Sequence, residues 1–146
     1  MNVDYNTDFF LWTQQQAAFL RQGVLSDIDM ANLAEEIESM GKRDRRAVGS
    51  YLANILLHLL KWCYQPQCRS ASWEDSIDNG REQVEWLVKD SPSLRTQLNL
   101  LIDEVYLRAR RKASRETGLP LTAFPEQCPF TVEQVIEDYW PELKSP

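Results

Sequence analysis

A single apolar pattern limits the folds open to this chain more than any other feature. Between Val48 and Cys63, apolar residues recur at spacings of three and four, and Pro66 follows shortly after. At about 100° per residue, these spacings place the side chains on one wide face of an α-helix. Ala53 and Leu57 extend that face round the helix, so we predict a central helix that other helices contact on several sides.

Residues that start or stop helices predict two more helices before the central one. Thr7 or Asp8 can cap a first helix that ends at Gly23. Asp29 can cap a second helix, which we expect Gly41 to end or bend. The apolar stripe of this second helix consists of Leu33, Ile37 and Met40.

Similar signals follow the central helix. Ser72 with Asp75 predicts a capping box at the start of the next helix. In that helix Gly80 occupies an apolar position, which predicts the close approach of a neighbouring helix. Ser91-Pro92 is typical of a helix start, and the helix that it opens is expected to run to Gly118.

The remaining segment completes the fold prediction. Residues 119–130 are punctuated by prolines and are expected to lie extended across the bundle, anchored by Phe124 and Phe130. Thr131 and Gln134 can cap a short last helix. No alternating strand pattern occurs, so we predict an all-α fold: an antiparallel bundle of four principal helices with short additional helices and an extended C-terminal segment. At 146 residues, 43% of them hydrophobic, we expect one domain over residues 1–146.

The charge and the apolar runs bear on partners and location. A net charge of −6 argues against binding to nucleic acid through the phosphate backbone. No apolar run approaches the roughly 20 residues that a membrane span needs, so we expect no membrane partner. The first ten residues lack the basic start and apolar centre of a signal peptide, which favours a cytoplasmic location.

The three cysteines do not predict a disulfide framework or a zinc site. Cys63, Cys68 and Cys128 are odd in number and form no CxxC pair. Together with His58 they could supply a Cys3His set, but the spacing of Cys63 and Cys68 is longer than that of paired zinc ligands. Free, buried thiols are favoured, and we expect no metal and no cofactor.

A polar cluster of Glu35, Glu36, Glu38 and His58 is a candidate site between two helices. Helical bundles build metal sites from carboxylates on one helix and an imidazole on its neighbour, although the Glu-x-x-His pattern of di-iron proteins is absent. Buried polar groups need partners whether or not they function. We therefore expect His58 to pair with Glu36 for structural reasons, which would favour its charged form.

Two basic clusters could contact phosphates, but neither interleaves aromatic residues as single-strand binders do. The second also lies in the last turns of its helix, where cations complement the helix dipole. We interpret both as solvated, ion-paired faces of an acidic protein. The first consists of Lys42, Arg43, Arg45 and Arg46, and the second of Arg108, Arg110, Arg111, Lys112 and Arg115.

The joint after the central helix is the candidate surface for a partner or an anion. Tryptophan, tyrosine and arginine dominate binding hot spots, and a helix N-terminus with a nearby arginine can attract an anion. We expect an exposed Arg69 and at least one partly accessible tryptophan here. The alternative is a joint whose aromatic residues fill the end of the bundle. The candidate residues are Lys61, Trp62, Tyr64, Arg69, Ser72 and Trp73.

One set of residues and short strings is spread over nearly the whole chain: Tyr5, Asp8, Phe9 and Trp12; 33–38; 58–62; 64–66; Arg69, Ser70, Ser72 and Trp73; 91–94; 116–120; and Phe124, Pro125, Cys128 and Pro129. Together these strings resemble a bacterial family catalogued only as domain-of-unknown-function family twenty-nine. The resemblance implies a small helical bundle, but it brings no known activity, cofactor or catalytic residue.

Two hypotheses of function follow. The first is a non-enzymatic helical module that acts in regulation or through protein partners, including a second copy of itself. The alternative is a small metal- or anion-dependent enzyme that uses Glu36, His58 and Arg69. Because no nucleophile elbow and no glycine-rich phosphate loop occurs, we assign no catalytic residue and favour the first.

Overall fold

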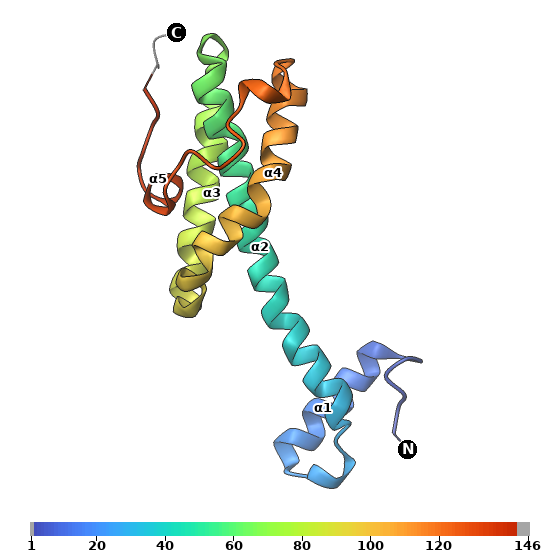
Figure 1. Ribbon diagram of the computed structural model, residues 1–146. Coiled ribbons are helices and arrows are strands. Elements are labelled where there is room, and N and C mark those ends of the chain that lie inside the picture. Colours follow the sequence, from blue (N-terminus) through green and yellow to red (C-terminus); the bar gives the residue numbers. More distant parts are fainter. Residues whose placement is uncertain (1, 143–146) are drawn as a thin grey trace. The chain divides into compact units, whose positions relative to one another are not determined.

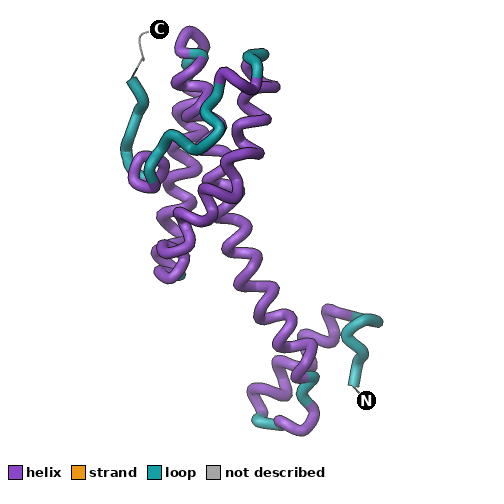
Figure 2. The backbone as a smooth tube through the Cα atoms, in the orientation of Figure 1, coloured by secondary structure: helices purple, strands orange, loops and turns teal. Residues whose placement is uncertain are grey.

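The computed structural model describes residues 2–142, which form helices joined by short loops (Figures 1 and 2). No strand occurs within this range, and four long helices, α1 to α4, are followed by the short helix α5. The predicted all-α fold is confirmed. Two compact units divide the chain, Met1–Arg43 and Asp44–Pro146, which we call the N-terminal unit and the C-terminal unit.

The N-terminal unit contains α1 (Phe9–Gln22), a 3₁₀ turn η1 (Leu25–Asp27) and the start of α2. Of the two predicted caps, Asp8 begins α1, since its side chain accepts a hydrogen bond from the Leu11 amide at 3.0 Å. Gly23 ends α1 as predicted, with a left-handed φ of 71°. A residue with a side chain would be strained in this backbone conformation.

Helix α2 runs from Met30 to Tyr64 without interruption, so the prediction that Gly41 ends the second helix is wrong. The helix begins after Asp29, whose side chain accepts a hydrogen bond from the Asn32 amide at 3.4 Å. A glycine inside a helix costs only about 1 kcal/mol, and neighbours with good helix propensity offset this cost. The second and the central helix of the sequence prediction are therefore one helix.

The starts of α3 and α4 also differ from the prediction. The cap of α3 (Ala71–Asp90) is Ser70 and not Ser72, because Ser70 has the extended backbone and accepts from the Trp73 amide at 3.3 Å. Ser91 makes no side-chain cap, and the 3₁₀ helix η3 (Pro92–Gln97) precedes α4 (Leu98–Thr117). Gly118 ends α4 as predicted, with φ of 74°.

The core lies in the C-terminal unit, where α3 and α4 lie beside the later part of α2 (Figure 1). A Cβ atom on Gly80 would lie 2.6 Å from Cγ1 of Ile55, which confirms the close approach predicted at this glycine. The fully buried side chains of α2 that form the centre of this core are Val48, Leu52, Ile55, Leu56, Leu59 and Leu60.

The segment after α4 packs along the bundle. It forms the turn η4 (Leu121–Ala123) and then α5 (Val132–Ile136), which begins with the predicted capping box. Phe124 is buried as expected, and the Tyr106 hydroxyl donates to the Pro125 carbonyl at 2.6 Å. Within residues 2–142, no helix has the length and apolar character needed to cross a membrane.

Candidate functional site

The structure does not bring Glu36 and His58 together. Both lie on α2 and not on two neighbouring helices, because the helix continues through Gly41. The Glu36 carboxylate accepts a hydrogen bond from the Tyr5 hydroxyl, in the N-terminal unit. His58 Nδ1 lies 2.8 Å from the Asn54 carbonyl oxygen, one turn earlier on α2. The predicted pair is therefore wrong, and each residue has a partner of its own.

The electrostatic surroundings of His58 also differ from the prediction. Burial lowers the pKa of this imidazole below its usual value of 6.5, while the hydrogen bond with Asn54 acts in the opposite direction. Lys61 lowers the pKa further, and Glu116 raises it. The neutral form of His58 is thus favoured in the folded protein, whereas the sequence had favoured the charged form.

The remaining carboxylates of the predicted cluster stay apart from His58. Glu35 and Glu38 are exposed on the part of α2 that belongs to the N-terminal unit. Throughout residues 2–142, no three histidine, cysteine, aspartate or glutamate side chains are grouped so that they could hold a metal ion. The described geometry therefore offers no preformed site for the metal-dependent alternative.

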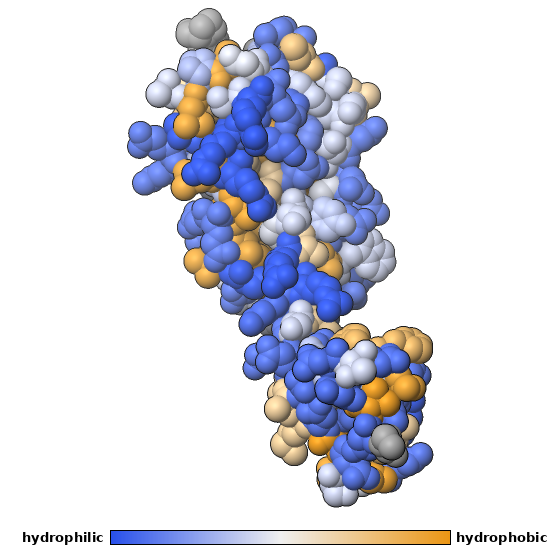
Figure 3. All heavy atoms as spheres, turned by 90° about the vertical axis from the view of Figure 1, so that its right-hand side faces the viewer, coloured by the Kyte–Doolittle hydropathy of each residue, from blue (hydrophilic) through white to orange (hydrophobic). Residues whose placement is uncertain are grey.

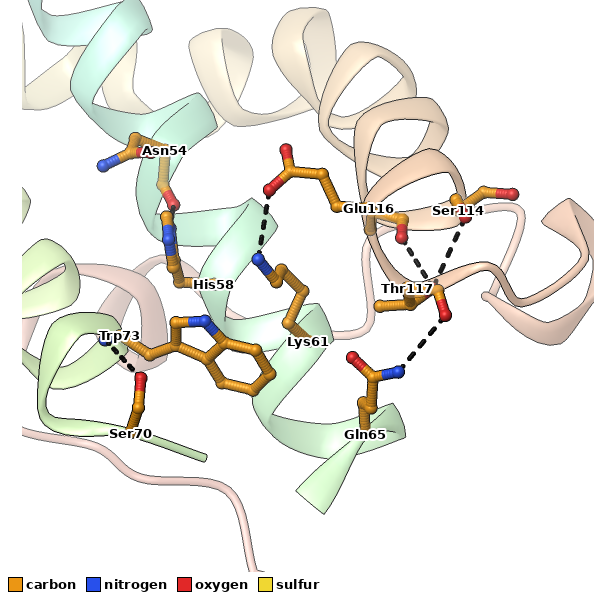
Figure 4. A network of polar contacts seen from close by, with 10 residues as sticks. Asn54, His58, Lys61, Gln65, Ser70, Trp73, Ser114, Glu116 and Thr117 are labelled. Atoms are coloured by element: carbon orange, nitrogen blue, oxygen red, sulfur yellow. Dashed lines mark hydrogen bonds and ion pairs between the residues drawn. The ribbon is translucent and has the colours of Figure 1, made fainter. Parts of the chain in front are cut away.

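Lys61 is the centre of a polar network at the joint (Figure 4). Its ammonium group lies 3.0 Å from Oε1 of Glu116 on α4 and 4.7 Å from the ring centre of Trp73 on α3. Only 8% of Lys61 is exposed, so the ion pair and the ring replace most of its water. One turn later, Gln65 donates to the Thr117 carbonyl at 3.2 Å. Lys61 thus connects three helices.

Arg69 serves a similar internal role at the other side of the joint. Its Nε donates to the Trp62 carbonyl at 3.0 Å, and its Nη2 donates to the Pro141 carbonyl at 3.4 Å. The guanidinium also lies 4.6 Å from the Trp62 ring centre, and Trp62 packs against Trp140 at 4.9 Å. Arg69 is therefore half-buried, and the prediction that it is exposed is wrong.

The other residues predicted for the surface at the joint differ in how far they are exposed. Trp62 and Trp73 are both half-buried, so the expected partial access to a tryptophan is confirmed. Tyr64 packs against Phe124 at 5.2 Å between ring centres, and Ser72 is exposed in the first turn of α3. Most polar and aromatic groups of the joint contact one another or the C-terminal segment. These contacts support the structural alternative for this region.

A different apolar surface lies on the N-terminal unit, and sequence reasoning missed it. Figure 3 shows apolar patches among hydrophilic ones on the surface of this unit. Eight of the twelve exposed large hydrophobic residues found in the described part of the chain, residues 2–142, belong to it, with exposed fractions from 44% to 74%. They are Phe9, Phe10, Leu11, Leu20, Leu25, Met30, Ile37 and Met40.

The interior of the N-terminal unit is small. Among its described residues, 2–43, the only buried ones are Trp12 and Gln16, both on α1. Both bind Asp29: the Trp12 indole donates to the Asp29 carboxylate at 3.0 Å, and the Gln16 side chain accepts from the Asp29 amide at 2.7 Å. These bonds hold α1 against the start of α2, but they leave most of the apolar side chains of the unit in contact with water.

The C-terminal unit contains a cavity of about 920 Å³ between α3, the start of α4 and the end of α5. Its apolar lining comes from Val84, Val88, Leu98 and Ile136. Three cationic side chains also line it: Arg81, Lys89 and Arg95. Five carboxylates outnumber them: Asp78, Glu82, Glu85, Glu137 and Asp138.

Arg81 is the most buried charged residue of this cavity, with 7% of its surface exposed. Its Nε donates to the Val135 carbonyl at 2.9 Å, and its Nη2 donates to the carbonyls of Gln134 at 2.9 Å and Tyr139 at 2.7 Å. Burial lowers the pKa of the guanidinium, whereas Asp138 and Asp78 raise it. The second terminal nitrogen, Nη1, is buried and has no hydrogen-bond partner.

Comparison with protein families gives a match over residues 5–141 to the family described as "Domain of unknown function DUF29". The chain belongs to this family. Neither the curated proteins nor the solved structures give a match. Membership in DUF29 accounts for the resemblance of the sequence strings, but the family description names no activity.

Part of the cavity lining of this DUF29 member is recognisable in the sequence of α3. Asp78, Glu82 and Glu85 follow one another at spacings of four and three, which places three carboxylates on one face of α3. Arg81 could not be identified in the same way, because the carbonyls that bind it lie more than fifty residues later in the chain.

Proposed function

We propose that the protein is a non-enzymatic interaction module whose N-terminal unit binds the same unit of a second copy. The surface of this unit carries the proposal. It exposes eight large hydrophobic residues and buries only Trp12 and Gln16. A unit of this size with one buried large apolar residue lacks a core of its own, and the association of two copies would supply the missing contacts.

The face available for this contact lies on α2. Met30, Ile37 and Met40 are 74%, 63% and 54% exposed. With Leu33 they follow the spacing of three and four residues that forms the seam of a two-helix coiled coil. Burying an exposed methionine or isoleucine contributes about 1.5–3 kcal/mol, so a symmetric contact that uses this stripe twice can offset the entropic cost of association.

The charges of α2 favour a second copy in the antiparallel direction. Glu35, Glu36 and Glu38 lie in the second half of the stripe, and Lys42 and Arg43 follow it. A parallel pair would place like charges side by side, whereas an antiparallel pair centred near residues 39 and 40 places the three glutamates of each helix beside Lys42 and Arg43 of the other. Such a contact is two-fold symmetric, which is the commonest arrangement of homodimers.

The first experiment measures the oligomeric state of the full chain by sedimentation velocity. We expect the unaltered protein to be a dimer and the Ile37→Glu variant to be a monomer, because a carboxylate would be buried in the seam. Leu107→Glu is the matched control, since Leu107 is 50% exposed on α4 and lies outside the seam. A monomeric parent protein, or equal dissociation of both variants, would contradict the proposal.

The second experiment tests the direction of the contact by charge exchange. Glu35→Lys with Glu38→Lys should weaken self-association, because two basic halves then face each other. Lys42→Glu with Arg43→Glu should have the same effect. A mixture of the two variants should associate again as a mixed dimer, which energy transfer between labelled chains can measure. If the mixture does not associate better than either variant alone, the antiparallel arrangement is wrong.

No observation on residues 2–142 favours the enzyme alternative over this proposal. Glu36, His58 and Arg69 have separate intramolecular partners and do not converge on the cavity. The joint residues Lys61 and Trp73 are likewise engaged in internal contacts. We therefore assign them a role in holding the three helices of the C-terminal unit together.

A further inference from the structure

We infer that the outer face of α4 binds an acidic helical segment of a protein partner. Four cations of α4 contact the carboxylates of this segment, and two exposed leucines of the same helix contact its apolar residues. The inference does not depend on the self-association proposed above, because every residue that it uses lies in the C-terminal unit. The four cations, which we call the basic stripe, are Arg108, Arg111, Lys112 and Arg115.

The basic stripe occupies one side of α4, and all four of its side chains are exposed. Their spacing places them within about 100° of the helix circumference and over about 10 Å of its length. In Figure 3, where the α4 side of the C-terminal unit faces the viewer, strongly hydrophilic side chains gather on this unit. Arg110 is used differently, since its Nε and Nη2 donate to the Phe124 carbonyl at 3.2 and 3.0 Å. The structure thus separates one internally bonded arginine from four exposed cations.

The cations of the basic stripe have no ion-pair partner within residues 2–142. The two ion pairs of this range are Arg45–Glu104 and Lys61–Glu116, and neither includes a residue of the stripe. The predicted exposure of this cluster is therefore confirmed, whereas the predicted ion pairing is wrong. Like charges three and four residues apart destabilise a helix, so the free protein carries a repulsion that an anionic partner would relieve.

The helix dipole accounts for only part of this arrangement. Cations near the C-terminus of a helix are stabilised by its dipole, but the effect is confined to the last turn. Helix α4 ends at Thr117, so Arg115 lies within reach of the dipole. Arg108 and Arg111 lie nine and six residues before that end, where the dipole no longer offsets their repulsion. Their position is consistent with a contact surface and is not explained by helix stability.

Two exposed leucines extend the basic stripe toward the start of α4. Leu100 is 54% exposed and Leu107 is 50% exposed. Because they lie seven residues apart, they share one face of the helix, and Arg111 follows Leu107 on that face after four residues. Apolar residues at this spacing form the seam between paired helices. Contacts to a phosphate backbone do not need such a seam, so the leucines favour a protein partner.

Carboxylates at both ends of the basic stripe limit the length of the anionic ligand. Asp103 and Glu104 lie before the stripe, and Glu116 lies after it. A nucleic acid would continue past both ends and place its phosphates beside these carboxylates. About two turns of an acidic helix match the stretch from Arg108 to Arg115 and need not extend further. The charge distribution therefore also favours a short acidic segment over a nucleic acid.

The partner helix should run antiparallel to α4. In this direction the acidic residues lie in its first turns, where the positive end of its own dipole stabilises carboxylates. These turns contact the basic stripe, and the following turns cover Leu107 and then Leu100. Both charge complementarity and the order of apolar and basic residues along α4 are satisfied by this direction.

The experiment titrates a labelled acidic peptide with the full chain at a fixed, low salt concentration and measures fluorescence anisotropy. The peptide begins with four glutamates spaced as the four cations are and continues with two leucines seven residues apart, with alanine and glutamine elsewhere. For Arg111→Gln with Lys112→Gln we expect the affinity to fall about tenfold or more, because two charged contacts are lost. The matched control, Lys89→Gln with Arg95→Gln, removes the same charge from exposed positions outside the stripe and should change the affinity less than about twofold.

A second comparison separates a protein partner from a nucleic acid. Leu107→Ala should weaken binding of the acidic peptide about fivefold, because less apolar surface is buried, and should leave binding of labelled oligothymidylate unchanged. The parent protein should bind oligothymidylate at least about tenfold more weakly than the peptide. Tighter binding of oligothymidylate would overturn the protein partner in favour of a nucleic acid. No binding of the peptide, or an equal loss in the charge control, would overturn the surface itself.

Discussion

The two units of this protein use the same kind of helix in different ways. Up to residue 142, the C-terminal unit buries eighteen apolar residues in one cluster, most of them on α2 and α4. From residue 2 onward, the N-terminal unit buries one large apolar residue, Trp12, and leaves the Met30–Met40 stripe of α2 exposed. Helix α2 contributes an apolar stripe to both units. The apolar periodicity of a helix therefore identifies the face that can be buried, but it does not identify the segment that packs against that face.

Because of this difference, we assign most of the folding stability of the chain to the C-terminal unit and the contact with a partner to the N-terminal unit. A residue such as Leu59 contacts neighbours on all sides, whereas Ile37 is 63% exposed. The first type of residue contributes to the free energy of unfolding of the single chain, and the second contributes when a partner covers it. Substitutions that compare equivalent residues in the two units therefore test this assignment directly.

The largest expected effect comes from removing a buried leucine. Leu59→Ala should lower the free energy of unfolding by about 2–5 kcal/mol, because it leaves a cavity in the core of the C-terminal unit. Leu20→Ala, at a position 51% exposed on α1, should lower it by less than about 0.5 kcal/mol in the monomer. Urea titration followed by circular dichroism measures both. Equal losses would mean that the N-terminal unit has a core of its own.

Smaller effects on the free energy of unfolding are expected from replacing two glycines, Gly80 on α3 and Gly41 on α2, and the two effects should have opposite signs. Gly80→Ala should destabilise the protein by about 1–2 kcal/mol, because the new Cβ would lie 2.6 Å from Ile55 and this overlap outweighs the gain in helix propensity. Gly41→Ala should stabilise it by up to about 1 kcal/mol, since no atom lies within 4 Å of the new Cβ.

The double variant Gly80→Ala with Ile55→Ala shows whether the overlap is the cause. Removing the Ile55 side chain makes room, so Gly80→Ala should no longer destabilise the protein in that background. If Gly80→Ala costs the same with and without Ile55, the close approach of α2 and α3 does not determine its effect. A destabilising Gly41→Ala would indicate that α2 is less regular at the end of the N-terminal unit than its continuous helix implies.

The smallest effects are differences in the pH dependence of the two units. Burial lowers the pKa of His58, so the unfolded chain binds a proton more readily than the folded one. The free energy of unfolding should therefore fall as the pH drops below the usual imidazole value of 6.5, and this fall should be reduced in His58→Gln. Because the chain has one histidine, a single imidazole resonance reports the pKa.

The N-terminal unit should respond at lower pH. Hydrogen bonds from Asn32 and Trp12 hold the pKa of Asp29 below its usual value of 3.8. Stability from this group is present above that value and is lost as the pH falls through the lower, folded-state pKa. The protection factors of amides near Asp29, which correct for the pH dependence of intrinsic exchange, should therefore stay high at pH 5 and fall below pH 3.8. A fall of these protection factors between pH 7 and 5 would contradict the assignment.

The fold was largely predictable because its signals are local. Asp8, Gly23, Gly118 and the Thr131–Gln134 box begin or end helices through contacts within a few residues. Prediction failed where two local signals competed. Ser70 and Ser72 both have the chemistry of a cap, and the extended backbone at Ser70 decided between them.

The candidate site was less predictable, because its partners are distant in the sequence. Glu36 and His58 have suitable chemistry for a pair, but a continuous α2 leaves each with a different partner. Arg69 reaches the Pro141 carbonyl, 72 residues later, and Arg81 reaches carbonyls between 53 and 58 residues later. Periodicity gives the face of a helix on which such a residue lies, but not the segment that meets it.

The amino-acid sequence thus determined the helices, most of their ends and the central position of Val48–Leu60, since backbone propensity and apolar spacing act over short distances. Only the tertiary structure decided which stripe became a core and which stayed exposed. It also decided that Lys61 and Arg69 are used internally and that the carboxylates of α3 face a cavity with Arg81. The physical reason is that burial and electrostatics depend on which segments meet, and side chains from several helices settle this together.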